Sequence, residues 1–222
     1  MLSYIIKYRE EFNRKESLKD VKLSNELIWS KRLFDVIVSS VITVFLLTWM
    51  IPLFGLIIKL DSPGPILYVQ PRTGHRRRRF NCLKFRTMKH NPNAEFKQAT
   101  KNDVRVTDFG SFLRRTNLDE MPQFLNVLYG EMSIVGPRPH AIQHDQEFWQ
   151  TIPDFEQRYK VKPGITGVAQ VRGLRGETSE LLYMKHRVKL DIWYINRQSF
   201  KLDLNVCRWT LEKMLKGDNK AW

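Results

Sequence analysis

Uncharged and charged stretches follow one another along this chain in long blocks. Residues 1–30 are polar and charge-dense, and they lack the long apolar core and small-residue cleavage site of a signal peptide. Residues 36–58 carry no charge, and this run is longer than the about 20 residues that a helix needs to cross a hydrocarbon core. A chain of 222 residues buries one good core. The pattern predicts a polar extension (1–30), a membrane helix (31–60) and a compact domain (61–222).

The apolar segment 36–58 allows three interpretations. Its length makes a single membrane span the default. Pro52 lies inside the run, however, and a proline removes a helix hydrogen bond and favours a kink. Both flanks are positive, with Lys31 and Arg32 before the run and Lys59 after it, so the positive-inside rule places both ends in the cytoplasm. We therefore favour a kinked, re-entrant helix over a spanning helix, and a buried helix of a soluble core ranks third.

A pair of strands is expected directly after the apolar segment. Residues 61–65, DSPGP, form a strong turn, and residues 66–70 have the pattern of a short strand. A second strand in residues 81–88, NCLKFRTM, points Lys84 and Arg86 to one side. Those two cations could grip phosphate, the arginine in bidentate fashion and the lysine as a point charge, or they could be surface charge.

Helices are expected in the rest of the domain. Residues 91–110 are polar and turn-rich and predict a loop, after which a helix starts near Gly110. Apolar residues recur at helical spacing from Leu118 to Leu128, and Gly130 follows as a plausible end of the helix. A helix of about three turns is therefore expected, and it opens with the acid pair in residues 116–123, TNLDEMPQ. Residues 199–217 form an amphipathic helix that suits either the membrane interface or core packing. These elements predict an α+β fold that is mostly helical, with a small sheet.

The charge balance narrows the class of partner. The chain has 37 basic and 23 acidic residues, a net charge of +14 and a pI near 9.9, which favours nucleic acid, an anionic membrane surface or a phosphorylated substrate. Arginines fill residues 76–79 soon after the apolar segment, and we prefer a loop tip against lipid headgroups to a merely solvated tip. Cys82 and Cys207 offer no framework of disulfides or metal knuckles, so both are expected to be reduced, buried thiols.

The acid pair, Asp119 and Glu120, has two interpretations. Thr116 with Asp119 fits a helix-capping pattern, and the residues alone favour this one, because acids in a first turn suit the helix dipole. The other is chemical: a carboxylate at a helix start stays ionised and serves as a nucleophile or a Mg²⁺ ligand. Adjacent helical residues point in different directions, so the two acids would divide the work. Arg114 could then neutralise a bound diphosphate.

Other polar residues offer weaker signals. Arg138 is clamped between two prolines in GPRP, which suggests a rigid anion contact. Arg172 and Arg175 lie in a glycine-punctuated region and could touch a sugar or a phosphate, or could simply belong to turns. His140 and His144 are four residues apart, but no third ligand follows in motif form, so surface histidines are favoured over a metal pair.

Several motifs, in this order and spacing, resemble the bacterial sugar transferases, which are monotopic polyprenyl-phosphate phosphoglycosyl transferases. The motifs are KRLFD, DSPGP, KFRTM, LRRTNLDEMPQ, GEMSIVGPRP and YKVKPGITGVAQVRG. The resemblance covers roughly residues 31–210, and together the motifs are highly specific. One feature differs: family members place the helix-breaking proline nearer to the KR pair, where this chain has LLTW, and Pro52 comes about one turn later.

The resemblance implies an enzyme on the cytoplasmic face of the inner membrane, held there by a re-entrant helix. It implies transfer of a sugar-1-phosphate from a UDP-sugar to undecaprenyl phosphate, with Mg²⁺ as cofactor and UMP as the released product. Asp119 would be the nucleophile that forms a covalent phospho-sugar intermediate, and Glu120 would help to place the metal. The stretch RGET at residues 175–178 resembles the branch that transfers glucose- or galactose-1-phosphate. Capsule, exopolysaccharide and O-antigen pathways all remain open.

The candidates for binding the substrate's phosphates and nucleotide are Lys84, Arg86, Arg114, Arg138, Arg175 and Asp203. Of these, Lys84, Arg114, Arg138 and Asp203 match positions of the family's motifs, and Arg86 and Arg175 are added from the residues themselves. The expected partners are the two substrates, inner-membrane lipids and, as an option, a second copy of the chain. The alternatives are a membrane-tethered nucleic-acid-binding protein and a non-catalytic scaffold. We expect no nucleic-acid partner, because the chain has neither a recognised module nor aromatics interleaved with its basic tract.

Overall fold

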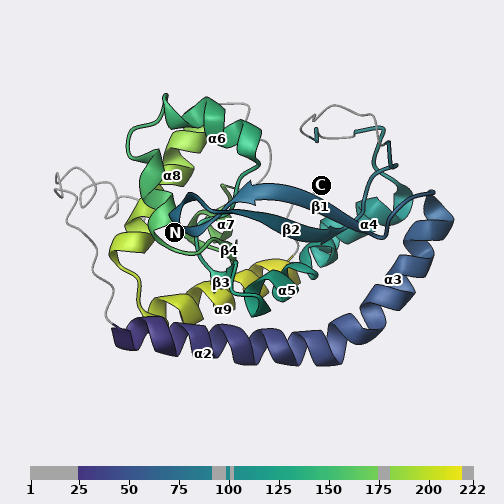
Figure 1. Cartoon of the computed structure of the whole chain (residues 1–222), viewed down its shortest axis with the longest axis horizontal. Helices are drawn as coiled ribbons and strands as arrows, with labels where there is room; N and C mark the ends of the chain where they lie inside the picture. Colours follow the sequence, from purple (N-terminus) through teal and green to yellow (C-terminus); the bar gives the residue numbers. More distant parts are fainter. Residues whose placement is uncertain (1–24, 92–98, 101–102, 175–180, 217–222) are drawn as a thin grey trace.

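The computed structural model describes residues 25–91, 99–100, 103–174 and 181–216 of the chain. Helices dominate, and two small sheets lie among them (Figure 1). The α-helices and strands are α2 (Asn25–Ile42), α3 (Thr48–Asp61), β1 (Leu67–Thr73), β2 (Arg79–Phe85), α4 (Asp108–Thr116), α5 (Gln123–Leu128), β3 (Ser133–Val135), α6 (Ile142–Trp149), β4 (Gly164–Thr166), α7 (Val168–Val171), α8 (Leu181–Asn196) and α9 (Phe200–Lys216). The prediction of a mostly helical α+β fold with a small sheet is confirmed.

A long apolar helix forms the base of the molecule. Helix α2, a π-helical turn at Thr43–Leu47 (η1) and helix α3 follow one another without a break. Among the described residues, one helix, Glu26–Asp61, is long and apolar enough to cross a membrane. Figure 1 shows the chain changing direction between α2 and α3. The helix continues through Pro52, and its irregular turn comes earlier, where the sequence reads TVFLL.

The wide turn and the proline lie close enough to act together. A proline has no N–H and its ring crowds the carbonyl four residues before it, here that of Thr48, so the preceding turn is the one that loosens. Two side chains donate to carbonyls of the wide turn: the Thr48 hydroxyl to Val44 at 2.7 Å and the Trp49 indole N–H to Phe45 at 2.9 Å. The π turn at Thr43–Leu47 overlaps residues 46–49, LLTW. This is the stretch that stands where members of the similar family have their helix-breaking proline.

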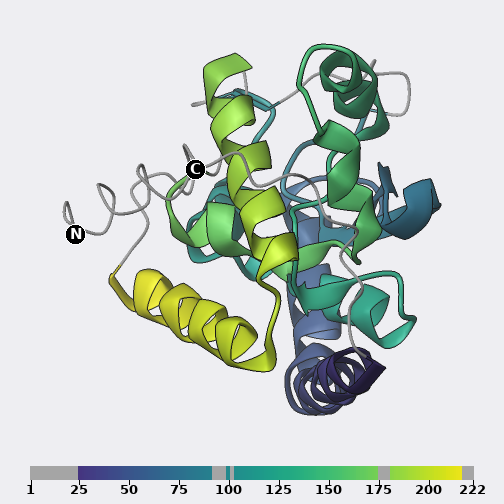
Figure 2. The same ribbon diagram turned by 90° about the vertical axis from the view of Figure 1, so that its left-hand side faces the viewer.

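The apolar helix is only partly covered by the domain. Met50, Phe54 and Ile58 on α3 pack against Phe85 and Leu113. The helix leaves many other large apolar side chains exposed: Trp29, Leu33, Ile37, Val41, Val44, Phe45, Trp49, Leu53, Leu56 and Leu60. Helix α9 lies at the same end of the molecule as α2 (Figure 2), and it exposes Leu211 and Leu215. A contiguous apolar surface of this kind marks a membrane or protein interface.

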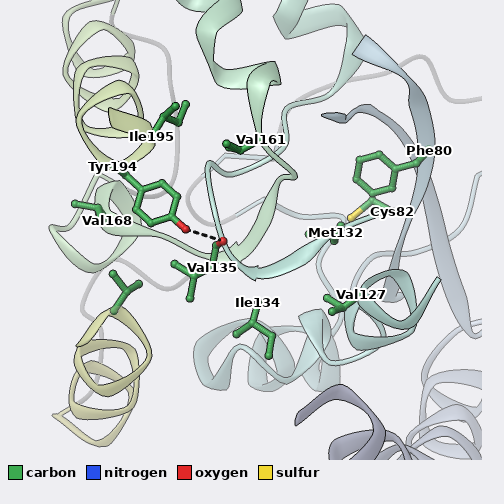
Figure 3. Close-up of a cluster of buried hydrophobic side chains, with 11 residues drawn as sticks. Phe80, Cys82, Val127, Met132, Ile134, Val135, Val161, Val168, Tyr194 and Ile195 are labelled. Carbon is green, nitrogen blue, oxygen red and sulfur yellow. Dashed lines mark hydrogen bonds between the residues drawn. The ribbon is translucent and has the colours of Figure 1, made fainter. Parts of the chain in front are cut away.

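Two strand pairs hold the middle of the domain together. Strands β1 and β2 form the predicted antiparallel hairpin, in register from Leu67 opposite Phe85 to Thr73 opposite Arg79. Strands β3 and β4 form a short parallel pair. The core between the sheets and helices is drawn in Figure 3. It consists of Phe80, Cys82, Val127, Met132, Ile134, Val135, Val161, Val168, Tyr194, Ile195 and Val206. Both cysteines are free thiols; Cys82 is buried, as expected, and Cys207 is only partly buried.

The arginine-rich turn between β1 and β2 packs against the domain. Arg76 and Arg77 adopt left-handed backbone conformations, with φ of 53° and 62°. The Arg77 guanidinium lies 4.0 Å from the Trp149 ring centre and pairs with Glu156 at 2.8 Å. The preference for a lipid-facing loop tip therefore does not hold for Arg77. Its ion pair is exposed, and exposed pairs contribute about 0–1 kcal/mol.

Candidate active site

The acid pair lies in a single turn of 3-10 helix, η3 (Leu118–Glu120), and does not begin a three-turn helix. Thr116 is the last residue of α4, and its hydroxyl donates to the Phe112 carbonyl at 2.9 Å, so the predicted Thr116 cap is wrong. Asn117 ends α4 in the left-handed region, which asparagine tolerates better than most residues. The predicted stop at Gly130 is confirmed by its φ of 82° after α5.

A proline explains why the expected three-turn helix does not form here. Pro122 lies between η3 and α5 and has no N–H to donate, so the ladder of helical hydrogen bonds is interrupted at that point. The result is a tight turn that presents two adjacent carboxylates from a buried position. Asp119 is 8% exposed and Glu120 is 6% exposed. Buried carboxylates require compensating charge, and the structure supplies it from three other segments.

Glu120 is held by two cations. Its Oε1 atom lies 2.8 Å from Lys84 Nζ on β2 and 2.5 Å from an Arg138 guanidinium nitrogen. Its Oε2 atom accepts from the other terminal nitrogen of Arg138 at 3.2 Å. Burial alone would lower the pKa of Arg138, but the Glu120 carboxylate raises it above its usual value. The bidentate arrangement fixes Glu120 in both position and orientation.

Asp119 has a different environment. Lys84 Nζ is 3.9 Å from its Oδ2 atom, an ion pair that is longer than any of the contacts to Glu120. Burial lowers the pKa of the Arg114 guanidinium, and the nearby Asp119 carboxylate opposes that shift. Arg114 Nε donates a hydrogen bond to the Thr87 hydroxyl at 2.8 Å, which fixes the orientation of the guanidinium. Three cations against two carboxylates leave one positive charge, which suits an anionic ligand.

The loop that carries Arg138 is rigid. Gly136 N donates to Thr166 O at 2.9 Å, and Gly164 N donates to Pro137 O at 2.9 Å. These two glycines approach so closely that a Cβ atom on Gly164 would lie 2.0 Å from Gly136 N, so neither position accepts a side chain. The structure thus supports the prediction that GPRP presents Arg138 from a fixed backbone.

Two buried residues that the sequence did not single out support this cluster. Arg158 donates to the Arg138 carbonyl at 2.6 Å and to Asp191 at 2.8 Å, so it braces the loop from behind. Asn126 on α5 accepts from Leu83 N at 3.0 Å and donates to Asn81 O at 2.8 Å. The side-chain amide of Asn126 therefore binds the backbone of β2 at Asn81 and Leu83, and Leu83 is next to Lys84. Arg158 belongs to no recognisable local pattern, because its partners are distant in sequence.

Arg86 does not join Lys84 at the acid pair. Its guanidinium is buried and donates to the carbonyls of Ile58 at 3.1 Å, Ser62 at 2.6 Å and Pro63 at 2.5 Å. Lys84 is the sixth residue of β2, whereas Arg86 follows the end of that strand. All three carbonyls belong to the end of α3 or the turn after it, so Arg86 caps the apolar helix. The expectation that Arg86 binds phosphate is replaced by this structural role.

Replacement of Arg86 by Met should lower the free energy of unfolding by about 3 kcal/mol, because hydrogen bonds from a charged group to three buried carbonyls are lost. Chemical unfolding in detergent, followed by tryptophan fluorescence, measures the change. Arg115→Met, at an exposed position on α4, is the matched control and should have little effect. Normal stability combined with weakened substrate affinity in Arg86→Met would restore the phosphate-binding interpretation.

Asp203 is also remote from the acid pair. It is 1% exposed, and its carboxylate binds Lys31 Nζ at 2.6 Å and the Tyr194 hydroxyl at 2.7 Å. Burial raises the pKa of Asp203, and the neighbouring Lys31 opposes that shift. The Tyr194 hydroxyl also contacts the Val135 carbonyl (Figure 3). The expected substrate contact of Asp203 is therefore corrected: this acid joins α9 to α2 through Lys31 and to α8 through Tyr194.

The remaining candidates give mixed results. Arg175 lies outside the described residues. Arg172 lies over the Trp209 ring, 5.7 Å from its centre. His140 is buried, with its ring 3.0 Å from an Arg158 nitrogen, so the expectation of a surface histidine is wrong for this residue; the side chain of His144 lies outside the described part. The described residues contain no group of three His, Cys, Asp or Glu side chains that could hold a metal.

The acid pair still fits Mg²⁺ by the chemistry of its donors. Magnesium is usually held by one or two carboxylates, with water and substrate phosphates completing its shell, so a third protein ligand is not needed. Asp119 and Glu120 are adjacent carboxylates beside a cation-rich site. Lys84 and Arg138 occupy the oxygens of Glu120 in this structure, and a metal there would have to share them.

Comparison with known proteins gives the family. The model described as "Bacterial sugar transferase" matches residues 26–217, which include the apolar helix, the acid pair and the loop of Arg138. The chain belongs to the bacterial sugar transferase family.

Three similar proteins share one name, UDP-glucose:undecaprenyl-phosphate glucose-1-phosphate transferase. The protein of Xanthomonas campestris pv. campestris is 51% identical over 74% of this chain and 34% of its own length. That of Escherichia coli K12 is 45% identical over 88% of this chain and 42% of its own. That of Caulobacter vibrioides is 44% identical over 85% of this chain and 71% of its own. The chain thus spans well under half of the first two relatives.

Proposed function

We propose that this protein transfers a sugar-1-phosphate from a UDP-sugar to undecaprenyl phosphate and releases UMP. The observation that carries the proposal is the unequal acid pair: Lys84 and Arg138 bind Glu120 at 2.8 and 2.5 Å, whereas Lys84 lies 3.9 Å from Asp119, whose carboxylate is near Arg114. The three relatives above bear names for this type of reaction. A phosphoryl-transfer site works mainly by positioning and by charge stabilisation, and this cluster offers both.

In the first step, a carboxylate oxygen of Asp119 attacks the phosphorus next to the sugar. The bond from that phosphorus to the bridging oxygen breaks, and the electron pair leaves with UMP. In the second step, a phosphate oxygen of undecaprenyl phosphate attacks the same phosphorus, and Asp119 leaves as a carboxylate. Acyl-phosphates of this kind are established covalent intermediates. The product is a sugar joined to the lipid through a diphosphate.

Each cation has a part in these steps. Arg114 is placed to offset the charge of the diphosphate near Asp119, and Arg138 does so from its fixed loop while it holds Glu120. Lys84 lies between the two acids and offsets the negative charge of both. Mg²⁺, held by Asp119 and Glu120, would supply further neutralisation of the phosphate oxygens.

The apolar helix is proposed to insert into the inner membrane from the cytoplasmic face and to return to it. Both of its ends are fastened to the same domain, through Lys31 to Asp203 at the start and through Arg86 to Ile58 at the end. A helix that crossed the bilayer would separate these ends. Cysteines introduced on the two flanks should both react only with reagents that reach the cytoplasm, and labelling of one flank from outside would exclude the re-entrant path.

Glucose is the favoured sugar, because the relatives named above act on UDP-glucose by name. The stretch at residues 175–178 that suggested a glucose or galactose branch lies outside the described residues. Association into a homo-oligomer stays a prediction.

One assay tests the proposed function against its alternatives. Detergent-solubilised protein is incubated with a panel of UDP-sugars, Mg²⁺ and undecaprenyl phosphate, and the released nucleotide is identified. We expect UMP with one sugar, and removal of Mg²⁺ with a chelator should stop its release. Release of UDP would mean ordinary glycosyl transfer. No turnover together with tight RNA binding would favour a tethered nucleic-acid-binding protein, and no turnover without RNA binding would favour a scaffold.

A further inference from the structure

Helix α2 carries polar side chains that bind the backbone of the domain. Arg32 donates to the carbonyls of Val127 and Leu128, at 2.6 and 2.9 Å. These carbonyls are at the C-terminal end of α5, where the helix itself leaves its last carbonyls unpaired; that of Val127 also accepts from Gly130 N at 3.0 Å. Helix α5 starts only three residues after Glu120. Arg32 therefore holds the far end of the segment that carries the acid pair.

The next polar contacts from α2 reach β3. Asp35 Oδ1 accepts from the backbone N–H of Ile134 at 3.0 Å and from the Ser133 hydroxyl at 3.1 Å. Lys31 Nζ donates to the Val135 carbonyl at 2.9 Å. Strand β3 ends at Val135, three residues before Arg138. Asp35 and Lys31 therefore hold the far end of the segment that carries Arg138.

The near ends of the same two segments meet at the site, where Arg138 binds Glu120 through two hydrogen bonds. We propose that Lys31, Arg32 and Asp35, the α2 polar triad, are positioning residues for the transfer reaction, and that docking of α2 sets the separation of Glu120 and Arg138. This role rests on the function proposed above. It makes the membrane helix part of the catalytic framework as well as an anchor.

A topological role does not account for the whole triad. The positive-inside rule concerns Lys31 and Arg32, but Asp35 is negative, and negative residues contribute little to that rule. Asp35 is 2% exposed, and a buried carboxylate is costly unless donors satisfy it. Its donors are in β3, and so the sequence position of Asp35 is explained by docking to the domain.

The test uses Asp35, because its replacement separates docking from positive charge. Asp35→Ala should lower kcat for UMP release by about tenfold or more, since a small misplacement of reacting groups is enough to do so. Asp35→Asn keeps an oxygen acceptor and should restore kcat to within about threefold of the unaltered protein. Lys59→Met, an exposed cation at the other end of the apolar helix, is the control and should keep normal kcat.

Two further measurements exclude a general loss of folding. In a double-mutant cycle, the combined loss in Asp35→Ala with Arg138→Lys should be smaller than the product of the single losses, because both changes disturb one contact. Amide hydrogen exchange at residues 133–138 should be faster in Asp35→Ala than in the unaltered protein. This measurement does not depend on enzyme turnover. The fraction of protein recovered with membranes should not change.

The outcomes separate this role from the proposed function. Normal kcat in Asp35→Ala would overturn the positioning role alone, as would a loss that Asn does not rescue and that multiplies fully with Arg138→Lys. If the unaltered protein releases no UMP with any sugar, the proposed function fails, and the catalytic role of the triad fails with it.

Discussion

Asp119→Asn should abolish UMP release, and no covalent phospho-sugar adduct should form on the protein. An amide has the shape of the carboxylate but is not a nucleophile at phosphorus, so the loss should reach about four orders of magnitude or more. The change should leave the fold intact, because asparagine keeps the shape of aspartate and the ion pair of Asp119 with Lys84 is long, at 3.9 Å. Nucleotide chromatography measures the rate, and intact-protein mass spectrometry with UDP-sugar alone detects the adduct.

Asp108→Asn provides the matched control, because Asp108 is an exposed acid in the first turn of α4. It should release UMP at nearly the normal rate. Adduct formation in Asp119→Asn, or a rate within tenfold of the unaltered protein, would remove Asp119 from the role of nucleophile and leave the site without its proposed first step.

Glu120→Gln should slow UMP release by about a hundred- to a thousandfold without abolishing the adduct. Glutamine keeps the shape of the side chain but loses the charge that binds Lys84 and Arg138, so these cations are no longer fixed. The Mg²⁺ concentration needed for half-maximal rate should rise, since one of the two carboxylates is gone. The measurement is the initial rate of UMP release over a series of Mg²⁺ concentrations.

Glu212→Gln on α9 is the control for this second change. Glu212 forms an exposed ion pair with Arg208, which contributes little to stability. Its rate and Mg²⁺ dependence should be unchanged. Complete loss of the adduct in Glu120→Gln would make the two acids equivalent, contrary to their different surroundings in the structure.

Several errors in the sequence interpretation have one physical source: the local pattern does not show which partner a polar side chain finds in the folded chain. The capping pattern at Thr116 was plausible, but its hydroxyl already serves α4, and a short side chain makes few hydrogen bonds at once. Lys84 and Arg86 lie two residues apart, and alternation along a strand predicts one shared side. The strand ends at Phe85, so Arg86 turns to the end of α3 instead.

The partner of Asp203 was likewise not visible from the local sequence, where this acid lies in a motif that resembles the family's. Nothing local indicates whether such a carboxylate faces a substrate or a buried lysine. Its partner Lys31 is 172 residues away in the chain, and only packing of α9 against α2 brings them together. The bracing of Arg138 by Arg158 was missed for a related reason: a buried arginine and an exposed one look alike in the sequence.

The sequence by itself determined the elements whose causes are local. The uncharged run, the turn at residues 61–65, the amphipathic C-terminal helix and the stop at Gly130 follow from hydrophobicity and backbone preferences of neighbouring residues. The motifs also marked Asp119, Glu120, Lys84 and Arg138, which the structure brings together. Only the tertiary structure decided which charged residues join the site and which hold the framework. Charge–charge and hydrogen-bond contacts act over a few ångströms in space, whatever their separation in the chain, and burial decides which partner each group finds.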